Sequence, residues 1–208
     1  RHTRYIGDWS SNVCSSDLFR AVHGASFLWT PPGDGIFTLK AEITGTMNGA
    51  EILPVIFTRS VTVAWDGATV DTSWYDPLDT SASISNAAQL AGLAAIINGT
   101  AAGISTDNFA GKTVTLTGDV DLKNKEWTPI GTMTLPFSGN FDGSDHTLNG
   151  LAIGGASYLG LFGYASNASI QNLTVTGSVY GSGEYVGGIA GKADGTTALL
   201  NCTFGAQD

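Results

Sequence analysis

Three segments in the last third of the chain repeat one pattern. They are residues 136–153, 158–179 and 185–204. Each has an apolar core flanked by glycine, then a small polar turn, then a strand in which apolar residues alternate with others. The glycines that close the three cores, 20 and 28 residues apart, are Gly143, Gly163 and Gly191. Self-similarity at this period predicts a solenoid with one coil per repeat. Strand formers and turn formers dominate the repeats, so the coils should be β rather than helical.

The strands that follow the repeat cores should stack on one another. Leu151, Leu173 and Cys202 occupy the same place in their repeats, 22 and 29 residues apart. Since one face of each strand must be buried, we expect these side chains to lie stacked inside parallel coils that span residues 112–204. The first strand region of these coils, residues 112–122, carries four alternating residues that should face inward. They are Val114, Leu116, Val120 and Leu122.

Four glycine-rich motifs recur through this region. They are WTPIG (127–131), FSGNFDG (137–143), GLFG (160–163) and GGIAG (187–191). Together they resemble the GLUG repeat of bacterial surface proteins, over roughly residues 74–204. The resemblance implies a parallel β-helix on an exported bacterial protein and implies no reaction. Such repeats accompany adhesin-like proteins and the non-catalytic regions of some IgA-cleaving metallopeptidases. We therefore predict an all-β fold, with a right-handed parallel β-helix over residues 81–208 that is truncated at the C-terminus, further repeats being expected beyond it.

Residues 86–97 have the only strong helical pattern in the chain. Ser85 or Asn86 can cap the free N–H groups at the start, and Asn98-Gly99 supplies the stop. The apolar residues recur at spacings of three and four as a single stripe, made of Leu90, Leu93, Ala94 and Ile97. The first coil of a solenoid would otherwise expose its core and an unpaired strand edge. We therefore predict that this helix is the N-terminal cap of the β-helix.

Upstream of the helix, residues 35–45 and 55–65 alternate apolar and polar side chains, as half-buried strands do. The two strands resemble the closing strands of a bacterial immunoglobulin-like sandwich, so residues 19–65 are interpreted as a partial module of that kind. Residues 66–80 are polar and rich in turn formers, and we interpret them as a linker. Trp74-Tyr75 within it should dock onto the following module, the alternative being a platform on which carbohydrate stacks.

Residues 1–18 resemble a translated sequencing-adapter read of the kind found at the ends of metagenomic fragments. The chain has no initiator methionine, and neither repeats nor composition connect this segment to the rest. We therefore expect it to be a non-native tail outside the fold, the alternative being a genuine N-terminal strand.

Composition restricts the kinds of partner. Charged residues are only 13% of the chain, glycine contributes 28 residues, and the net charge is −9, which suits an extracellular or cell-surface β protein better than a cytosolic enzyme. No basic stripe for nucleic acid can be assembled, since no arginine follows Arg59. The cations beyond that point are Lys112, Lys123, Lys125 and Lys192. No apolar run approaches the ~18 residues that membrane insertion requires.

The most acid–base-like cluster in the sequence is Asp142, Asp145 and His146. Paired carboxylates can hydrolyse glycosides, and β-helices host enzymes that cleave polysaccharides. The same residues are also ordinary turn formers, because aspartate and serine bond their own backbone. The turn is the interpretation we favour, and an enzyme stays the alternative.

Other short motifs fail on their context. Gly111-Lys112-Thr113 lacks the earlier glycine of a phosphate-binding loop and opens a strand. Asp119-Val120-Asp121 is followed by lysines, which do not suit a calcium site. Cys202 fits a small buried hydrophobe better than a nucleophile.

These observations predict no catalytic, metal-binding or cofactor-binding residues in the chain. The predicted function is that of a non-catalytic structural or adhesive repeat region of a secreted or cell-surface bacterial protein, whose partner is a glycan or an extracellular host protein. The alternatives are a polysaccharide-active β-helix enzyme and a non-catalytic region of a larger secreted peptidase.

Overall fold

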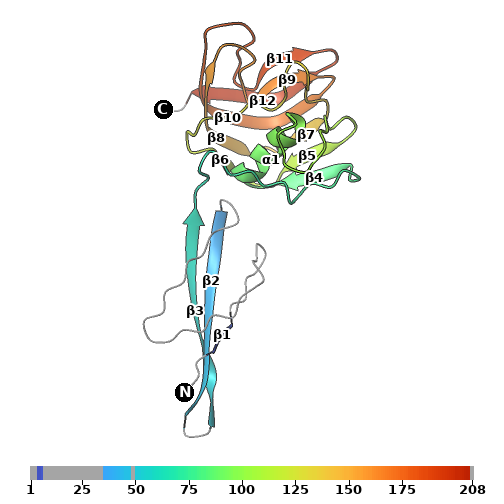
Figure 1. Cartoon of the computed structure of the whole chain (residues 1–208). Helices are drawn as coiled ribbons and strands as arrows, with labels where there is room; N and C mark the ends of the chain where they lie inside the picture. The colour runs from blue at the N-terminus through green and yellow to red at the C-terminus, as the bar shows by residue number, and fades with distance from the viewer. Residues whose placement is uncertain (1–3, 7–34, 48–49, 207–208) are drawn as a thin grey trace. The chain divides into compact units, whose positions relative to one another are not determined.

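The computed structural model describes residues 4–6, 35–47 and 50–206 (Figure 1). The chain divides into two compact units, Arg1–Ala64 and Trp65–Asp208, each of which is described here by itself. The described helix has 11 residues, and no helix in the described part of the chain is long and apolar enough to cross a membrane.

The first unit contains a three-stranded antiparallel sheet. Its order is β1 (Arg4–Ile6), β2 (Gly35–Met47) and β3 (Ala50–Val63). The two long strands confirm the alternating pattern as strands, while an immunoglobulin-like sandwich stays a prediction. Strand β1 falls within the segment that we expected to lie outside the fold, yet it pairs with β2 through Tyr5 and Ile43.

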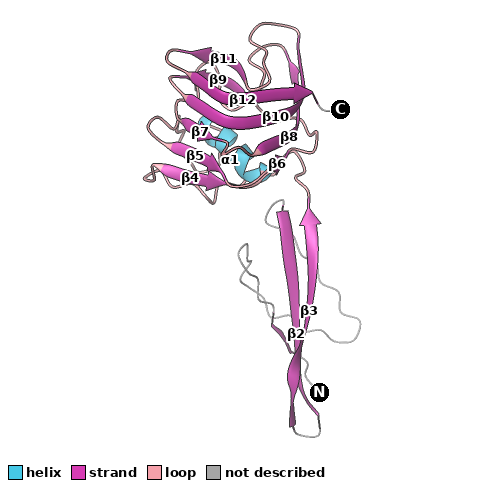
Figure 2. Cartoon of the chain, turned by 180° about the vertical axis from the view of Figure 1, so that it is seen from behind, coloured by secondary structure: helices cyan, strands magenta, loops and turns pink. Residues whose placement is uncertain are grey.

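The second unit is a β-solenoid of about four turns (Figures 1 and 2). Parallel pairing groups its strands into three faces. The first face contains β4 (Ser81–Ile84), β5 (Thr113–Leu116), β7 (Asn140–Asp142) and the start of β10 (Ser169–Gly181). The second contains β6 (Val120–Asp121), β8 (Thr147–Gly155) and the end of β10. The third contains β9 (Phe162–Ser166) and β11 (Ala190–Asp194), and β12 (Ala198–Ala206) then pairs along β10.

The predicted parallel coils are confirmed, but one predicted register is wrong. Leu173 does pair with Cys202. Leu151 instead pairs with Gly177, because β8 and β10 are aligned from Thr147 and Thr174 onward, which already places Leu151 several residues beyond Leu173. Coils of unequal length cannot keep every repeat position at the same level. Leu151 and Leu173 are both buried, whereas Cys202 is half-buried.

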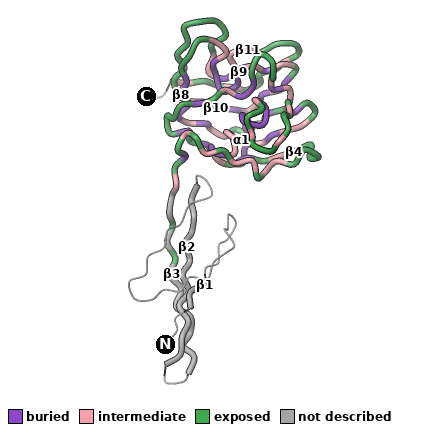
Figure 3. Tube along the Cα trace, viewed as in Figure 1, coloured by how far each residue is buried: buried purple, intermediate pink, exposed green. Residues whose placement is uncertain are grey.

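The interior of the solenoid consists of stacked apolar side chains, and the residues that carry them are the buried positions along the coils in Figure 3. On the first face, Val114, Phe141 and Ile170 lie in register and are all 0% exposed. Phe162 from the third face joins Phe141, with their ring centroids 5.3 Å apart. The four residues predicted to face inward from residues 112–122 are all buried, as expected: Val114, Leu116, Val120 and Leu122. Each coil therefore buries its inner side against its neighbours.

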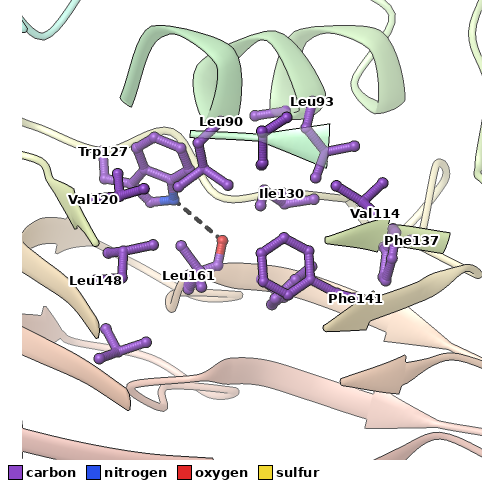
Figure 4. Close-up of a cluster of buried hydrophobic side chains, with 14 of the residues drawn as sticks. Leu90, Leu93, Val114, Val120, Trp127, Ile130, Phe137, Phe141, Leu148 and Leu161 are labelled. Carbon is purple, nitrogen blue, oxygen red and sulfur yellow. Dashed lines mark hydrogen bonds between the residues drawn. The ribbon is translucent and has the colours of Figure 1, made fainter. Parts of the chain in front are cut away.

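Helix α1 (Ala87–Ile97) lies against the first coils and matches the predicted element closely. The Asn86 side chain accepts from the Gln89 N–H at 2.9 Å, and the Gln89 amide oxygen accepts in return from the Ser85 N–H at 2.8 Å. Leu90 and Leu93 extend from the helix toward the solenoid interior (Figure 4). There they meet a layer where the buried Trp127 indole donates to the Leu161 carbonyl oxygen, as the dashed line shows.

The helix is buried on more than the single stripe that we predicted. Segment 66–80, interpreted from sequence as a linker, belongs to the second unit and packs along the opposite side of the helix. The Asp71 N–H donates to the Ala88 carbonyl oxygen at 2.9 Å, and the Asp71 carbonyl comes so close that Gly92 has no room for a Cβ. The high alanine and glycine content of the helix allows this contact, because these residues permit a second layer of backbone to approach.

Candidate functional site

The structure does not link the three residues of the predicted acid–base cluster. Asp142, at the end of β7, accepts from the Ser144 N–H at 2.8 Å, the Gln171 side-chain amide at 3.0 Å and the Asn172 side-chain amide at 3.1 Å. The Ser144 backbone bond, followed by the Gln171 bond, lowers the pKa of Asp142 from its ordinary value. These contacts are those of a turn that ties one coil to the next.

His146 and Asp145 have different surroundings. His146 Nδ1 lies 3.4 Å from Asp119 Oδ1, and that same oxygen accepts from the Thr147 N–H at 2.9 Å. Asp145 is exposed on a left-handed backbone, with φ of 62°. Among the described residues, no hydrogen bond or ion pair joins Asp142, Asp145 and His146 to one another.

The remaining sequence candidates have local structural contacts. Asp121 Oδ2 lies 2.6 Å from Lys123 Nζ, and no group of three or more possible metal ligands occurs in the described part of the chain. Lys112 is paired with Asp107 at 2.8 Å and also donates to the Pro77 carbonyl oxygen. Burial raises the pKa of the Cys202 thiol, which favours the protonated, unreactive form.

Trp74 and Tyr75 pack onto the solenoid unit through Phe109. The Tyr75 ring lies 5.7 Å from the Phe109 ring, and the Trp74 ring lies 6.3 Å from it. The Tyr75 hydroxyl donates to Asp107 at 2.8 Å. Burial, together with this bond to a carboxylate, raises the pKa of Tyr75 to about 12. This is the docking role that we favoured over a carbohydrate platform.

A cluster that the sequence analysis did not single out gathers on the third face of the solenoid. We call it the tyrosine surface, and its members are Met133, Tyr158, Tyr164, Tyr185 and Lys192. The rings of Tyr158 and Tyr185 stack with centroids 4.9 Å apart, and the Tyr158 hydroxyl contacts the Met133 sulfur at 3.4 Å. Met133 is 62% exposed and Tyr185 is 40% exposed. Side chains from successive coils thus form one apolar and aromatic patch that solvent reaches.

Lys192 is the one charged member of the tyrosine surface, and it pairs with Asp194 beside it. The Lys192 ammonium lies 4.9 Å from the centre of the Tyr164 ring and 5.3 Å from that of Tyr185, as in a cation–π contact. It is also 3.3 Å from Asp194 Oδ2, the oxygen that accepts from the Tyr164 hydroxyl at 2.9 Å. The hydrogen bond to Asp194 raises the pKa of Lys192. The Gly195 N–H, followed by the Tyr164 hydroxyl and the Lys192 ammonium, lowers the pKa of Asp194. Both groups therefore stay charged around neutral pH.

The backbone at Tyr158 and Tyr185 is unusual. Their φ angles are 60° and 63°, in the left-handed region that favours glycine and asparagine. Asn167, Asn172 and Asn201 occupy other corners of the solenoid in this conformation, where their short side chains suit it. A bulky residue in the left-handed region costs about 1–2 kcal/mol. The fold bears this cost at both Tyr158 and Tyr185, and residues held in such strained conformations often belong to functional sites.

The repeat pattern contains a signal for this surface. Tyr158 and Tyr185 each stand immediately before the glycine-rich core of their repeat, in YLGLFG and YVGGIAG. Equal positions in successive coils bring side chains within contact distance, because neighbouring strands lie about 4.8 Å apart. Lys192 and Tyr164 carry no such signal, since their pairing depends on the register between β9 and β11.

A cavity of about 210 Å³ lies between α1, residues 65–70 and residues 126–128. The Trp65 and Trp127 indoles line it, with Glu126 and Thr128 as polar neighbours. Both indole N–H groups already donate elsewhere, Trp65 to Thr69 and Trp127 to Leu161. The two tryptophans are only 4% and 3% exposed, so their rings offer little surface to a ligand.

The chain has no detected similarity to known proteins: no family model, no curated protein and no solved structure matches it. A β-solenoid by itself specifies no activity, because one architecture can hold many functions. The tyrosine surface is therefore the feature from which a function can be argued.

Proposed function

We propose that residues 81–208 are a structural and adhesive repeat region of a secreted or cell-surface bacterial protein, without catalytic activity. The observation that carries this proposal is the tyrosine surface, a partly exposed aromatic patch in which Tyr158 and Tyr185 occupy equivalent positions of successive coils. Tyrosine is enriched in binding surfaces because its ring supplies contact area while its hydroxyl accommodates water or a polar partner. The GLUG-like motifs and the low charge content support an extracellular setting.

The solenoid gives this surface a stiff support. Eight residues of β10 pair in register with β12, and polar side chains link the same corner of three coils: Asn172 donates to Asp142, and Asn201 donates to Asn172, each at 3.1 Å. Each coil contacts only its neighbours, so such an array holds side chains at fixed intervals along one direction. A rigid support reduces the entropy lost when a partner binds.

We further propose that α1 is the N-terminal cap of a right-handed coil. Leu90 and Leu93 are 0% exposed and lie over the interior of the first coils (Figure 4). The Asn98 side chain joins the end of the helix to the next coil, donating to the Pro129 carbonyl oxygen at 2.9 Å and accepting from the Gly131 N–H at 3.0 Å. A helix so placed keeps water and foreign strands from the apolar columns. Residues 19–65 are proposed, on their resemblance alone, as part of an immunoglobulin-like module.

The adhesive role is tested by binding of the full chain to immobilised mucin, fibronectin, collagen and purified bacterial cell wall. We expect retention on at least one of these, and loss of retention in the Tyr185→Asn variant. Asparagine suits the left-handed backbone, so this change removes the ring without adding strain. Tyr180→Asn is the matched control, because Tyr180 is a 75% exposed tyrosine outside the tyrosine surface. Absence of retention on every surface, or equal retention by both variants, would contradict the proposal.

A further inference from the structure

The tyrosine surface combines aromatic rings with a charged pair that retains hydrogen-bonding capacity. A carboxylate offers about four lone-pair positions and an ammonium three donors. Asp194 accepts from the Gly195 N–H at 2.7 Å, from the Tyr164 hydroxyl and from Lys192. Lys192 uses one donor in the ion pair. One acceptor position and further donors are thus available beside the rings, on side chains that are 52% exposed for Asp194 and 28% exposed for Lys192.

The charge of this surface limits the class of ligand. Lys192 and Asp194 neutralise each other across 3.3 Å, so the surface has neither a free cation to hold an anionic polymer nor a free carboxylate to hold a cation. A ligand that fits must be uncharged, apolar on one side and rich in hydroxyl groups on its edges.

We propose that the tyrosine surface binds an uncharged glycan chain, which lies along the Tyr158–Tyr185 column and hydrogen-bonds to Lys192 and Asp194. Sugar rings meet the requirements: the C–H groups of a pyranose form an apolar surface that packs on an aromatic side chain, and its hydroxyls both donate and accept. Tyr158 and Tyr185 stack on one another one coil apart with centroids 4.9 Å apart, so a chain laid across the stack contacts the solvent-side edges of both rings in turn. This inference rests on the proposed adhesive function and names the ligand class of the same site.

The experiment is calorimetric titration of the full chain with neutral hexasaccharides, namely cellohexaose, maltohexaose, xylohexaose and mannohexaose, and with hexagalacturonate as the anionic arm. We expect at least one neutral hexasaccharide to bind, at least about tenfold weaker binding in Tyr185→Asn and in Asp194→Asn, and unchanged binding in Tyr180→Asn. Binding should also change little between about 0.05 and 0.5 M NaCl, because the recognised ligand is uncharged.

Three outcomes would overturn the inference: no neutral hexasaccharide binds at millimolar concentration, binding survives in Tyr185→Asn, or hexagalacturonate alone binds and is displaced by salt. The two proposals fail separately. If retention on mucin, fibronectin, collagen or cell wall depends on Tyr185 but none of the neutral hexasaccharides competes, the adhesive function stands and the glycan is the wrong ligand. If nothing retains the chain, the adhesive function itself is wrong.

Discussion

The ring of Tyr158 stacks on the ring of Tyr185, which occupies the equivalent place one coil further along, with the planes inclined by 29°. The separation of 4.9 Å between the centroids is close to the ~4.8 Å between neighbouring strands, so the spacing of the coils sets that of the rings. Both residues keep a left-handed backbone to hold this position. The left-handed backbone at each tyrosine is therefore unfavourable by itself, but it places the two rings where they stack on each other.

Tyr185→Asn should change stability little. Loss of the aromatic pair removes about 0.5–1.5 kcal/mol, while asparagine relieves about 1–2 kcal/mol of backbone strain. We expect the free energy of unfolding in urea to stay within about 1 kcal/mol of that of the unmodified chain. A loss of several kcal/mol, when Tyr180→Asn loses none, would show that the ring serves packing rather than recognition.

Gly163→Ala should destabilise the solenoid, because its added Cβ would lie 2.6 Å from the Gly131 carbonyl oxygen and 2.9 Å from the Tyr158 carbonyl oxygen. Backbone atoms on two sides cannot both move away. We expect a loss of about 1–3 kcal/mol, seen as a lower midpoint of thermal unfolding. Gly118→Ala is the control, since its Cβ would meet nothing within 4 Å. Equal midpoints for the two variants would contradict the close packing of the coils.

Leu93→Ala should cost about 2–5 kcal/mol, because Leu93 is 0% exposed between α1 and the solenoid interior. Leu93→Asp places an unpaired charge in the same apolar layer and should undock the helix. The uncovered coil would then associate with other molecules, which light scattering detects. Ser105→Asp introduces the same charge at an exposed position and is the control. Equal scattering from both aspartate variants would mean that α1 is not a cap.

Tyr75 should make stability depend on pH in the alkaline range. Its pKa is raised from 10.0 to about 12 in the folded chain, so the folded state retains a proton that the unfolded state loses. The stabilisation is fully present below pH 10.0 and is lost as the pH rises through about 12. Tyr75→Phe, in which this group cannot ionise, should therefore lose less stability than the unmodified chain when urea unfolding is compared across that range. Parallel pH profiles would show that Tyr75 does not titrate as the structure implies.

We expect no hydrolysis or elimination when the purified chain is incubated with neutral and uronic-acid polysaccharides and the reducing ends are assayed. The reason is that Asp142 is held by Ser144, Gln171 and Asn172, while His146 contacts Asp119. Turnover that disappears in Asp142→Asn or Asp145→Asn would prove this prediction wrong and support the enzyme alternative.

The local signals in the sequence were sufficient to predict a parallel β-solenoid and the helix. The repeat period predicted parallel coils, and the alternation over residues 112–122 predicted which side of that strand region is buried. Ser85 or Asn86 marked the start of α1, where the structure has Asn86 as the cap, and Asn98-Gly99 marked its end. These features depend on patterns within a few residues or on a regular period, both of which can be observed along a single chain. The unpredicted cover of α1 by residues 66–80 depends instead on how two distant segments pack.

The amino-acid sequence by itself determined that this protein coils its strands in parallel, where its helix begins and ends, and which side chains alternate into the core. Only the tertiary structure decided that Leu151 lies beside Gly177 rather than Leu173, and that Lys192 and Asp194 lie beside the tyrosines. The physical reason is register. Each coil has its own length and its own corner, so the level at which distant residues meet is set by backbone pairing along the whole stack.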